Sequence, residues 1–309
     1  KRWWQPVLIS LVAALVAFAP MLAFGFKYPG DVFGARSSTS FTNPELNNGK
    51  PLQTLLDTTV KTALMFNVHG DDNYRHNLGG EPMLNVFVGI MFILGMLICL
   101  TRLTSPRYFA LLAIFGVMLL PEVLTAEGIP HALRAIGAMP AVFVLAAIGI
   151  GYMLDQWYRT FPLNSAARGA GLGAMLVLLG LTAFQGYMQY FVAWAHAPQT
   201  YEAYSEDAVA VAKFLNQTGF EGQRYAVVHG FSDITILYLT HNQAKYERID
   251  PGQISQLPTD GAPKQFVIGQ GFKAEAIKRL TERFPDGRVS PHYSDFSGNE
   301  LFLVYETSK

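Results

Sequence analysis

Two residues three positions apart, His131 and Arg134, carry the clearest chemical signal in this sequence. On a helical turn, residues at that spacing share one face, so an imidazole and a guanidinium would point the same way. Arginine presents a planar fork of donors that fits a phosphate group. The pair therefore predicts a clamp for a phosphate or pyrophosphate. Alternatively, Arg134 is an interfacial residue paired with the nearby Glu122 or Glu127, and His131 caps the turn.

A second polar cluster follows Gly70, where carboxylate, amide, guanidinium and imidazole groups crowd into seven positions. This composition suits the wall of a pocket for a sugar or a phosphate. The oxygen-bearing side chains could instead ligate a divalent cation, but their spacing does not follow the EF-hand pattern, so we assign no metal and no cofactor. A solvated turn is the remaining interpretation. The cluster comprises Asp71, Asp72, Asn73, Arg75, His76 and Asn77.

A third candidate phosphate contact is Arg36, in the stretch 31–40. On its own it is also compatible with an ordinary surface arginine. The sequence contains no Ser–His–Asp order, CxxC pair, HExxH or phosphate-binding glycine loop, so no catalytic residue is assigned. The net charge of zero gives no reason to expect a nucleic-acid partner.

These polar clusters lie between apolar segments. Half of the 309 residues are hydrophobic and 15% are charged, against about 25% charged residues in a soluble domain. A membrane-spanning helix needs roughly 20 apolar residues. We therefore expect a membrane α-helical bundle with about five transmembrane helices, at Trp3–Phe26, Met83–Leu100, Tyr108–Leu124, Met139–Leu154 and Gly169–Trp194.

Basic residues in short connections orient such a bundle, because cytoplasmic loops are enriched in lysine and arginine. The first outer loop, 27–82, and the second, 125–138, are then extracytoplasmic, as is the tail after Trp194. Because the sequence begins without Met and its first apolar run is too long for a signal peptide, we also expect the chain to be a fragment lacking its N-terminal part. The basic residues on the cytoplasmic side are Lys1, Arg2, Arg102, Arg107, Arg159 and Arg168.

Two further segments have a clear pattern. In residues 51–66 apolar and polar positions fall on opposite helical faces, which predicts an amphipathic helix lying on the membrane. The tail, 199–309, alternates helical and strand patterns and predicts a small soluble α/β domain. Its expected helices are 206–218, 232–240 and 273–284, and its expected strands are 224–229, 245–249, 265–268, 288–294 and 300–305. The domains are therefore a bundle with structured outer loops, 1–198, and the α/β domain.

Three stretches, taken together, resemble the membrane half of the polyprenyl-phosphate-sugar glycosyltransferases, of the protein O-mannosyltransferase-like and aminoarabinose-transferase-like type. The resemblance covers about residues 1–200. The stretches are YPGDVFGAR at Tyr28–Arg36, MFNVHGDDN at Met65–Asn73 with Arg75–Asn77 and Pro82, and GIPHALRAIG at Gly128–Gly137.

The resemblance implies that a sugar held on a polyprenyl phosphate moves to an acceptor protein, lipid or glycan at the outer face of a bacterial or archaeal plasma membrane. It also implies that Arg134 and His131 hold the lipid phosphate, assisted by Arg36 and Arg75, while the acidic residue of the family lies in an N-terminal half outside this chain. Two other functions stay open. One is a non-enzymatic membrane protein whose α/β domain binds a ligand or partner. The other is a lipid-linked-sugar transporter, against which five helices without inverted repeats argue.

Overall fold

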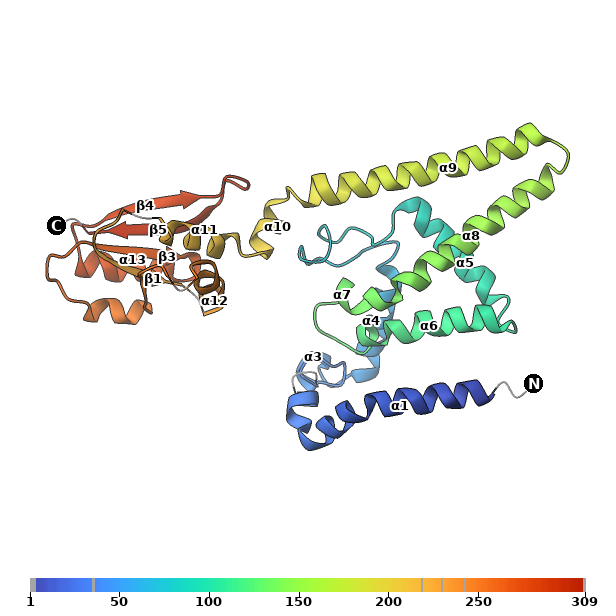
Figure 1. The fold of residues 1–309 in the computed structure, drawn as a ribbon, viewed down its shortest axis with the longest axis horizontal. Helices are drawn as coiled ribbons and strands as arrows, with labels where there is room; N and C mark the ends of the chain where they lie inside the picture. Colours follow the sequence, from blue (N-terminus) through green and yellow to red (C-terminus); the bar gives the residue numbers. More distant parts are fainter. Residues whose placement is uncertain (1–3, 35–36, 218, 229, 242, 308–309) are drawn as a thin grey trace. The chain divides into compact units, whose positions relative to one another are not determined.

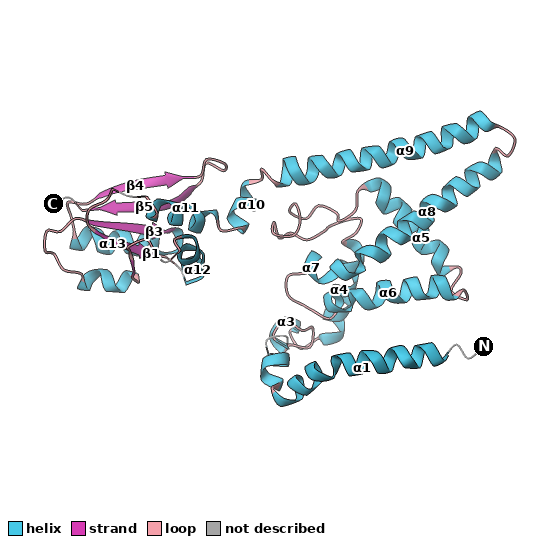
Figure 2. Cartoon of the chain, in the orientation of Figure 1, coloured by secondary structure: helices cyan, strands magenta, loops and turns pink. Residues whose placement is uncertain are grey.

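The computed structural model describes residues 4–34, 37–217, 219–228, 230–241 and 243–307. The chain divides into two compact units, Lys1–Gly186 and Tyr187–Lys309, which Figure 1 colours from blue to red along the sequence. Figure 2 shows that the first unit consists of helices and loops, whereas the second combines helices with a sheet.

In the described part of unit 1, five long helices form most of the structure, and shorter helical segments lie in the connections between them. The long helices are α1 (Trp4–Lys27), α5 (Val86–Leu100), α6 (Pro106–Val123), α8 (Met139–Thr160) and α9 (Ser165–Tyr187). The shorter segments are η1 (Gly30–Gly34), α3 (Pro44–Asn47), α4 (Pro51–Leu64), α7 (Ala132–Ala135) and η2 (Ile136–Ala138).

Three helical stretches are long and apolar enough to cross a membrane: Pro106–Val123, Ala132–Thr160 and Ser165–Trp194. Two shorter apolar helices, Val12–Lys27 and Val86–Leu100, accompany them among the described residues. Length and composition therefore support three of the five expected spans.

The second expected span, at 83–100, begins later than its apolar pattern suggested. Met83 and Leu84 donate their backbone N–H groups to the carbonyl oxygens of Met65 and Phe66, at 3.0 and 2.9 Å, instead of entering the helix. Asn85 then caps α5, because its side-chain oxygen accepts the N–H of Val88 at 2.9 Å. The helix that results has 15 residues.

The centre of unit 1 is the packing of α5 against α8. A Cβ atom at Gly95 would lie 1.8 Å from the carbonyl oxygen of Leu145, and one at Gly149 would lie 2.1 Å from that of Met91. Only glycine allows two helix backbones to approach this closely. The core around this contact includes Met65, Phe66, Met91, Phe92, Cys99, Leu119, Val142, Leu145 and Ala146.

The amphipathic helix expected at 51–66 is present as α4, and it packs with its polar side inward. Thr58 and Thr62 are buried, and the Thr58 hydroxyl donates to the carbonyl oxygen of Val123, at the end of α6, at 2.7 Å. The apolar row of α4 is exposed and consists of Leu52, Leu56, Val60 and Leu64. The location of this row at a membrane surface stays a prediction.

Unit 2 contains a five-stranded sheet in the order β2-β1-β3-β5-β4. Strands β2, β1 and β3 are parallel, and β5 runs antiparallel to both β3 and β4. The strands are β1 (Gln223–Val227), β2 (Glu247–Arg248), β3 (Lys264–Gly269), β4 (Arg288–Tyr293) and β5 (Glu300–Glu306). The helices are η3 (Met188–Trp194), α10 (Pro198–Ala203), α11 (Glu206–Leu215), α12 (Gly230–Leu239), η4 (Pro251–Gln256), η5 (Gln270–Phe272) and α13 (Lys273–Arg283).

Helices cover both faces of this sheet. Along the central strand β3, Val267 packs with the buried side chains of α11 and α12, whereas its neighbours Phe266 and Ile268 pack with those of α13 and η4. Successive side chains of a strand point to opposite faces, so β3 is apolar throughout its middle. The small α/β domain predicted from the tail is therefore confirmed.

Candidate functional site

Two loops of unit 1 carry the polar clusters, and they are joined to each other at several points. We call residues 28–85 the first loop and residues 124–138 the second loop. Near the start of both, Phe41 donates its N–H to the carbonyl oxygen of Leu124 at 3.1 Å, and Ala126 donates to that of Thr39 at 2.8 Å. A further join lies deeper, where the backbone N–H of Ala132 donates to Oδ2 of Asp71 at 2.8 Å.

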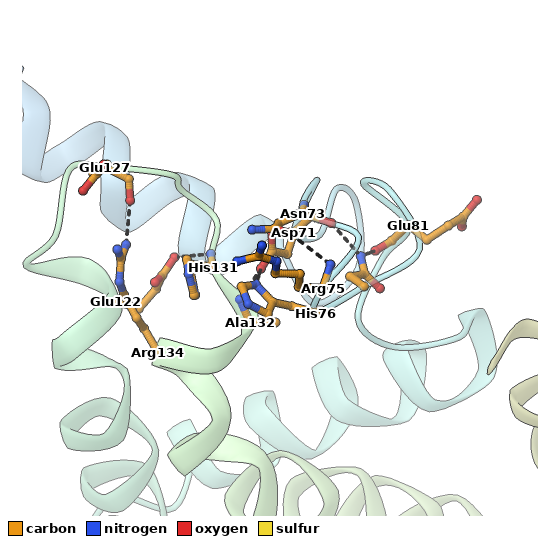
Figure 3. Close-up of polar contacts among 11 residues, drawn as sticks. Asp71, Asn73, Arg75, His76, Glu81, Glu122, Glu127, His131, Ala132 and Arg134 are labelled. Carbon is orange, nitrogen blue, oxygen red and sulfur yellow. Dashed lines mark hydrogen bonds and ion pairs between the residues drawn. The ribbon is translucent and has the colours of Figure 1, made fainter. Parts of the chain in front are cut away.

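Asp71 is the centre of this deeper join (Figure 3). Its Oδ1 accepts the N–H of Asn73 at 2.8 Å, and its Oδ2, besides accepting from Ala132, lies 2.9 Å from Nδ1 of His76. The side chains of Asp71 and His76 are only 3% and 10% exposed. The buried carboxylate of Asp71 thus contacts its own turn, the imidazole of His76 and the start of α7.

His131 brings a second imidazole to the same place. The ring centroids of His76 and His131 lie 4.5 Å apart, and the backbone N–H of His131 donates to Oε1 of the buried Glu122 at 2.7 Å. Its Nδ1 is buried and has no hydrogen-bond partner in the part of the chain that the structure describes. Burial lowers the pKa of His131, and the positive charge of Arg134 lowers it further. Burial therefore favours the neutral form of the ring, which can accept a bond at one nitrogen.

His131 stands at the N-cap position of α7, but its side chain makes no capping hydrogen bond. The carboxylate of Asp71 takes that role, and a negative charge at the first N–H groups of a helix is favourable. Arg134 donates from Nη1 to the backbone carbonyl oxygen of Glu127 at 2.6 Å, whereas the Glu127 side chain is exposed. The arginine therefore contacts the backbone of the second loop.

The turn that carries Asp71 is closed by a buried amide. Nδ2 of Asn77 donates to the carbonyl oxygens of Asp71 and Glu81, at 3.0 and 2.7 Å. Gly70 also donates its backbone N–H to the carbonyl oxygen of Gly80 at 2.9 Å, across the base of the turn. Asn77 therefore has a structural role in this segment, which fixes the position of Asp71.

The other residues singled out in the sequence lie away from this centre. Asp72 is exposed and pairs with His69 at 3.2 Å. Arg75 is exposed, and its backbone N–H donates to the side-chain oxygen of Asn73 at 3.0 Å. Arg36 lies outside the described residues. The structure thus brings Asp71, His76 and His131 together and leaves Asp72 and Arg75 at the surface of the first loop.

Two cavities adjoin the joined loops. One, of about 610 Å³, lies between α4 and the second loop and is lined by polar residues such as Thr54, Asp57 and Lys61. The other, of about 240 Å³, is mostly apolar and includes His76 in its wall. The lining of the apolar cavity also includes Met65, Phe66, Met83, Leu84, Leu133, Ile136, Met139 and Val142. An apolar cavity and a polar centre therefore lie side by side.

One grouping was missed in the sequence. Asp71, His76 and His131 each place one potential metal-ligating atom within 4.8 Å of the others, although the sequence assigned them to two separate clusters. Their spacing in the sequence did not indicate the grouping, because His131 lies some sixty positions from Asp71 and only folding brings the two together. No protein family, curated protein or solved structure matches this chain.

Proposed function

We propose that unit 1 carries the donor side of a membrane-embedded glycosyltransferase, which moves a sugar from a polyprenyl phosphate to an acceptor protein, lipid or glycan. The contact between Asp71 and Ala132 is the observation that carries this proposal, because it joins into one site the two loops that the sequence singled out. Five transmembrane helices, with both loops on the outer face of a plasma membrane, are part of the proposal.

The apolar cavity supports a lipid-linked donor. A polyprenyl phosphate is amphipathic, so its site needs an apolar surface for the isoprenoid chain beside polar groups for the phosphate. The cavity wall runs from His76 to Leu133, Ile136 and Met139, and these three apolar side chains are each more than half exposed. A chain lying along them would reach the polar centre from the lipid side.

Arg134 and His131 would act on the phosphate. A guanidinium offers five N–H donors, and the bond to Glu127 ties the arginine to an earlier part of its own loop. As the glycosidic bond breaks, negative charge grows on the leaving phosphate, and a fixed positive group there lowers the barrier. His131 would add a hydrogen bond to the phosphate. The proposal names no residue of this chain that would activate the acceptor.

The test is transfer activity of the full-length gene product in liposomes that contain a polyprenyl-phosphate-linked sugar and a membrane extract as acceptor. We expect Arg134→Ala to lower the transfer rate by about 10²-fold or more, the usual effect of removing one charge-stabilising donor. Arg134→Lys keeps the charge but not the fork, so it should recover part of the loss.

The matched control is Arg159→Ala on the same helical stretch. Arg159 is 73% exposed, pairs with Asp155, and lies near the far end of α8, about 30 Å along the helix from its start. Its replacement should leave the rate unchanged. A wild-type protein that transfers no sugar from any polyprenyl phosphate, or an Arg134→Ala variant with the normal rate, would refute the proposal.

A further inference from the structure

We propose that Asp71, His76 and His131 form a binding site for a divalent transition metal, with zinc as the best-fitting ion. The inference goes beyond sugar transfer and does not depend on it, because metal binding is measured without any substrate. It rests on the position of the three side chains, which come from both loops of unit 1 and meet at the deeper join (Figure 3).

The distances are close to those of a metal centre. Zinc lies about 2.0–2.2 Å from imidazole nitrogen and carboxylate oxygen, so two ligands of a tetrahedral site are about 3.4 Å apart. The three potential ligating atoms here are all within 4.8 Å of one another, and Nδ1 of His76 is 2.9 Å from Oδ2 of Asp71. Side-chain rotations that bring the more distant atoms closer by up to about 1.4 Å, and that move His76 and Asp71 slightly apart, would complete the geometry.

An unused nitrogen points to a ligand. Nδ1 of His131 is buried and has no hydrogen-bond partner among the residues described. A buried polar atom without a partner is unfavourable, and the ring lies against that of His76, with centroids 4.5 Å apart. His76 already contacts the Asp71 carboxylate, but a cation bound between the three side chains would give the second imidazole a partner as well.

The backbone around the three side chains is held in place, as it is around metal ligands. Glu122 fixes the N–H of His131, Asn77 fixes the carbonyl of Asp71, and the N–H of Asn73 fixes Oδ1 of the same carboxylate. The bond to Oδ1 is an outer-shell contact of the kind that orients a ligand and raises metal affinity, whereas the other two bonds hold the backbone. The site is therefore built into the fold, with ligands from two segments that are themselves joined.

The chemistry of the ligands selects the class of ion. Two imidazoles and one carboxylate suit zinc and its neighbours in the first transition row. Magnesium and calcium prefer oxygen ligands, whereas two of the three side chains here offer imidazole nitrogen. Three protein ligands leave a fourth zinc position open to water or to an oxygen of a bound molecule.

The experiment uses the full-length protein in nanodiscs, purified without a histidine tag and stripped with a chelator. Zn²⁺ is titrated by calorimetry, and Co²⁺ is added separately so that its visible absorption reports ligand number and geometry. We expect one equivalent of either ion and a tetrahedral Co²⁺ spectrum. His76→Gln and His131→Gln should each weaken Zn²⁺ binding by about 100-fold or more, since loss of an outer-shell partner alone costs 10–100-fold.

His69→Gln is the matched control, because His69 lies in the same loop and pairs with the carboxylate of Asp72, next to Asp71. It should bind Zn²⁺ as the wild type does. The proposal is overturned if the wild type binds no Zn²⁺ or Co²⁺, or if His131→Gln, eluting and melting like the wild type, keeps full affinity. Failure of sugar transfer with intact Zn²⁺ binding would count against the proposed function alone.

Discussion

The carboxylate of Asp71 accepts the backbone N–H of Ala132 at 2.8 Å, although 61 positions separate the two residues. One of these residues lies in a turn of the first loop, and the other is the first residue of α7. Together with the bonds of Phe41 and Ala126 near the start of the loops, this contact holds the two loops to each other. Disruption of it should therefore affect the stability of unit 1 as well as the chemistry of the site.

Replacement of Asp71 by alanine should break the deeper join between the loops. The variant loses hydrogen bonds from Asn73 and Ala132 to a carboxylate that is 3% exposed, and bonds to buried charged groups contribute about 1.5–3 kcal/mol each. We expect a loss of at least about 2 kcal/mol of stability, seen as faster proteolysis of both loops and a lower melting temperature. Asp72→Ala, at a side chain 74% exposed, should change stability by less than about 0.5 kcal/mol.

Added bulk between α5 and α8 should destabilise unit 1. Gly149→Ala puts a methyl group 2.1 Å from the carbonyl oxygen of Met91, so the two helices must separate. Overpacking of this kind costs about 1–3 kcal/mol or more, which thermal aggregation of the detergent-solubilised protein would report. Gly151→Ala, two residues away with no atom within 4 Å of the added methyl, should melt like the wild type. Equal melting of both variants would contradict this prediction.

The stability of unit 2 should fall as the pH drops below the pKa of a free histidine side chain. His292 stacks on Phe302 with ring centroids 4.5 Å apart, and burial lowers its pKa. Above about pH 6.5 the ring is neutral in both the folded and the unfolded chain, so it contributes no pH dependence. Below that value the unfolded chain binds the proton first, and stability is lost until the pH reaches the lowered folded pKa.

Hydrogen exchange of β4 and β5 between about pH 7.5 and 5 would measure this loss, after correction for the intrinsic exchange rate. The change of protection with pH should be smaller in His292→Gln, which cannot take up a proton. An undiminished pH dependence in that variant would assign the effect to another group.

Asp260 should contribute to the stability of unit 2, because its carboxylate pairs with the buried Lys264. The side chain of Lys264 is 1% exposed, and its Nζ pairs with Asp260, itself 46% exposed. Asp260→Ala leaves the buried Lys264 side chain with a longer bond, to the carbonyl oxygen of Ala262 at 3.3 Å, and should lower the denaturant midpoint of unit 2. Lys264→Met removes charge and partner together, so it should be close to neutral. A larger loss for Lys264→Met than for Asp260→Ala would refute this account.

The elements of unit 2 were predictable because each has a local cause. The strand patterns at 224–229 and 265–268 and the helix at 273–284 correspond to β1, β3 and α13, whose ends differ from the expected ones by a few residues. Period-two and helical patterns arise within a few neighbouring residues. The start of α5 was mispredicted for a reason of another kind, since Met83 and Leu84 bond to a distant segment.

The amphipathic pattern of residues 51–66 predicted the helix α4, but it did not predict which face of the helix packs against the protein. Periodicity separates an apolar face from a polar one, yet it does not say which face meets protein. Here Thr58 and Thr62 face the protein and the leucine side is exposed. Likewise, the types of Asp71, His76 and His131 were noticed, but their convergence was not, because it depends on a through-space contact between loops.

The glycine contact between α5 and α8 also affects how fast the bond between Asp71 and Ala132 would re-form after it breaks. The first loop ends at the start of α5, the second ends at the start of α8, and the two helices touch through Gly95 and Gly149. If the bond between Asp71 and Ala132 breaks, both loops remain tethered to one stem. The bond then re-forms within one molecule, at a high effective concentration. The state with the bond broken should therefore be short-lived, and its lifetime should not depend on the protein concentration.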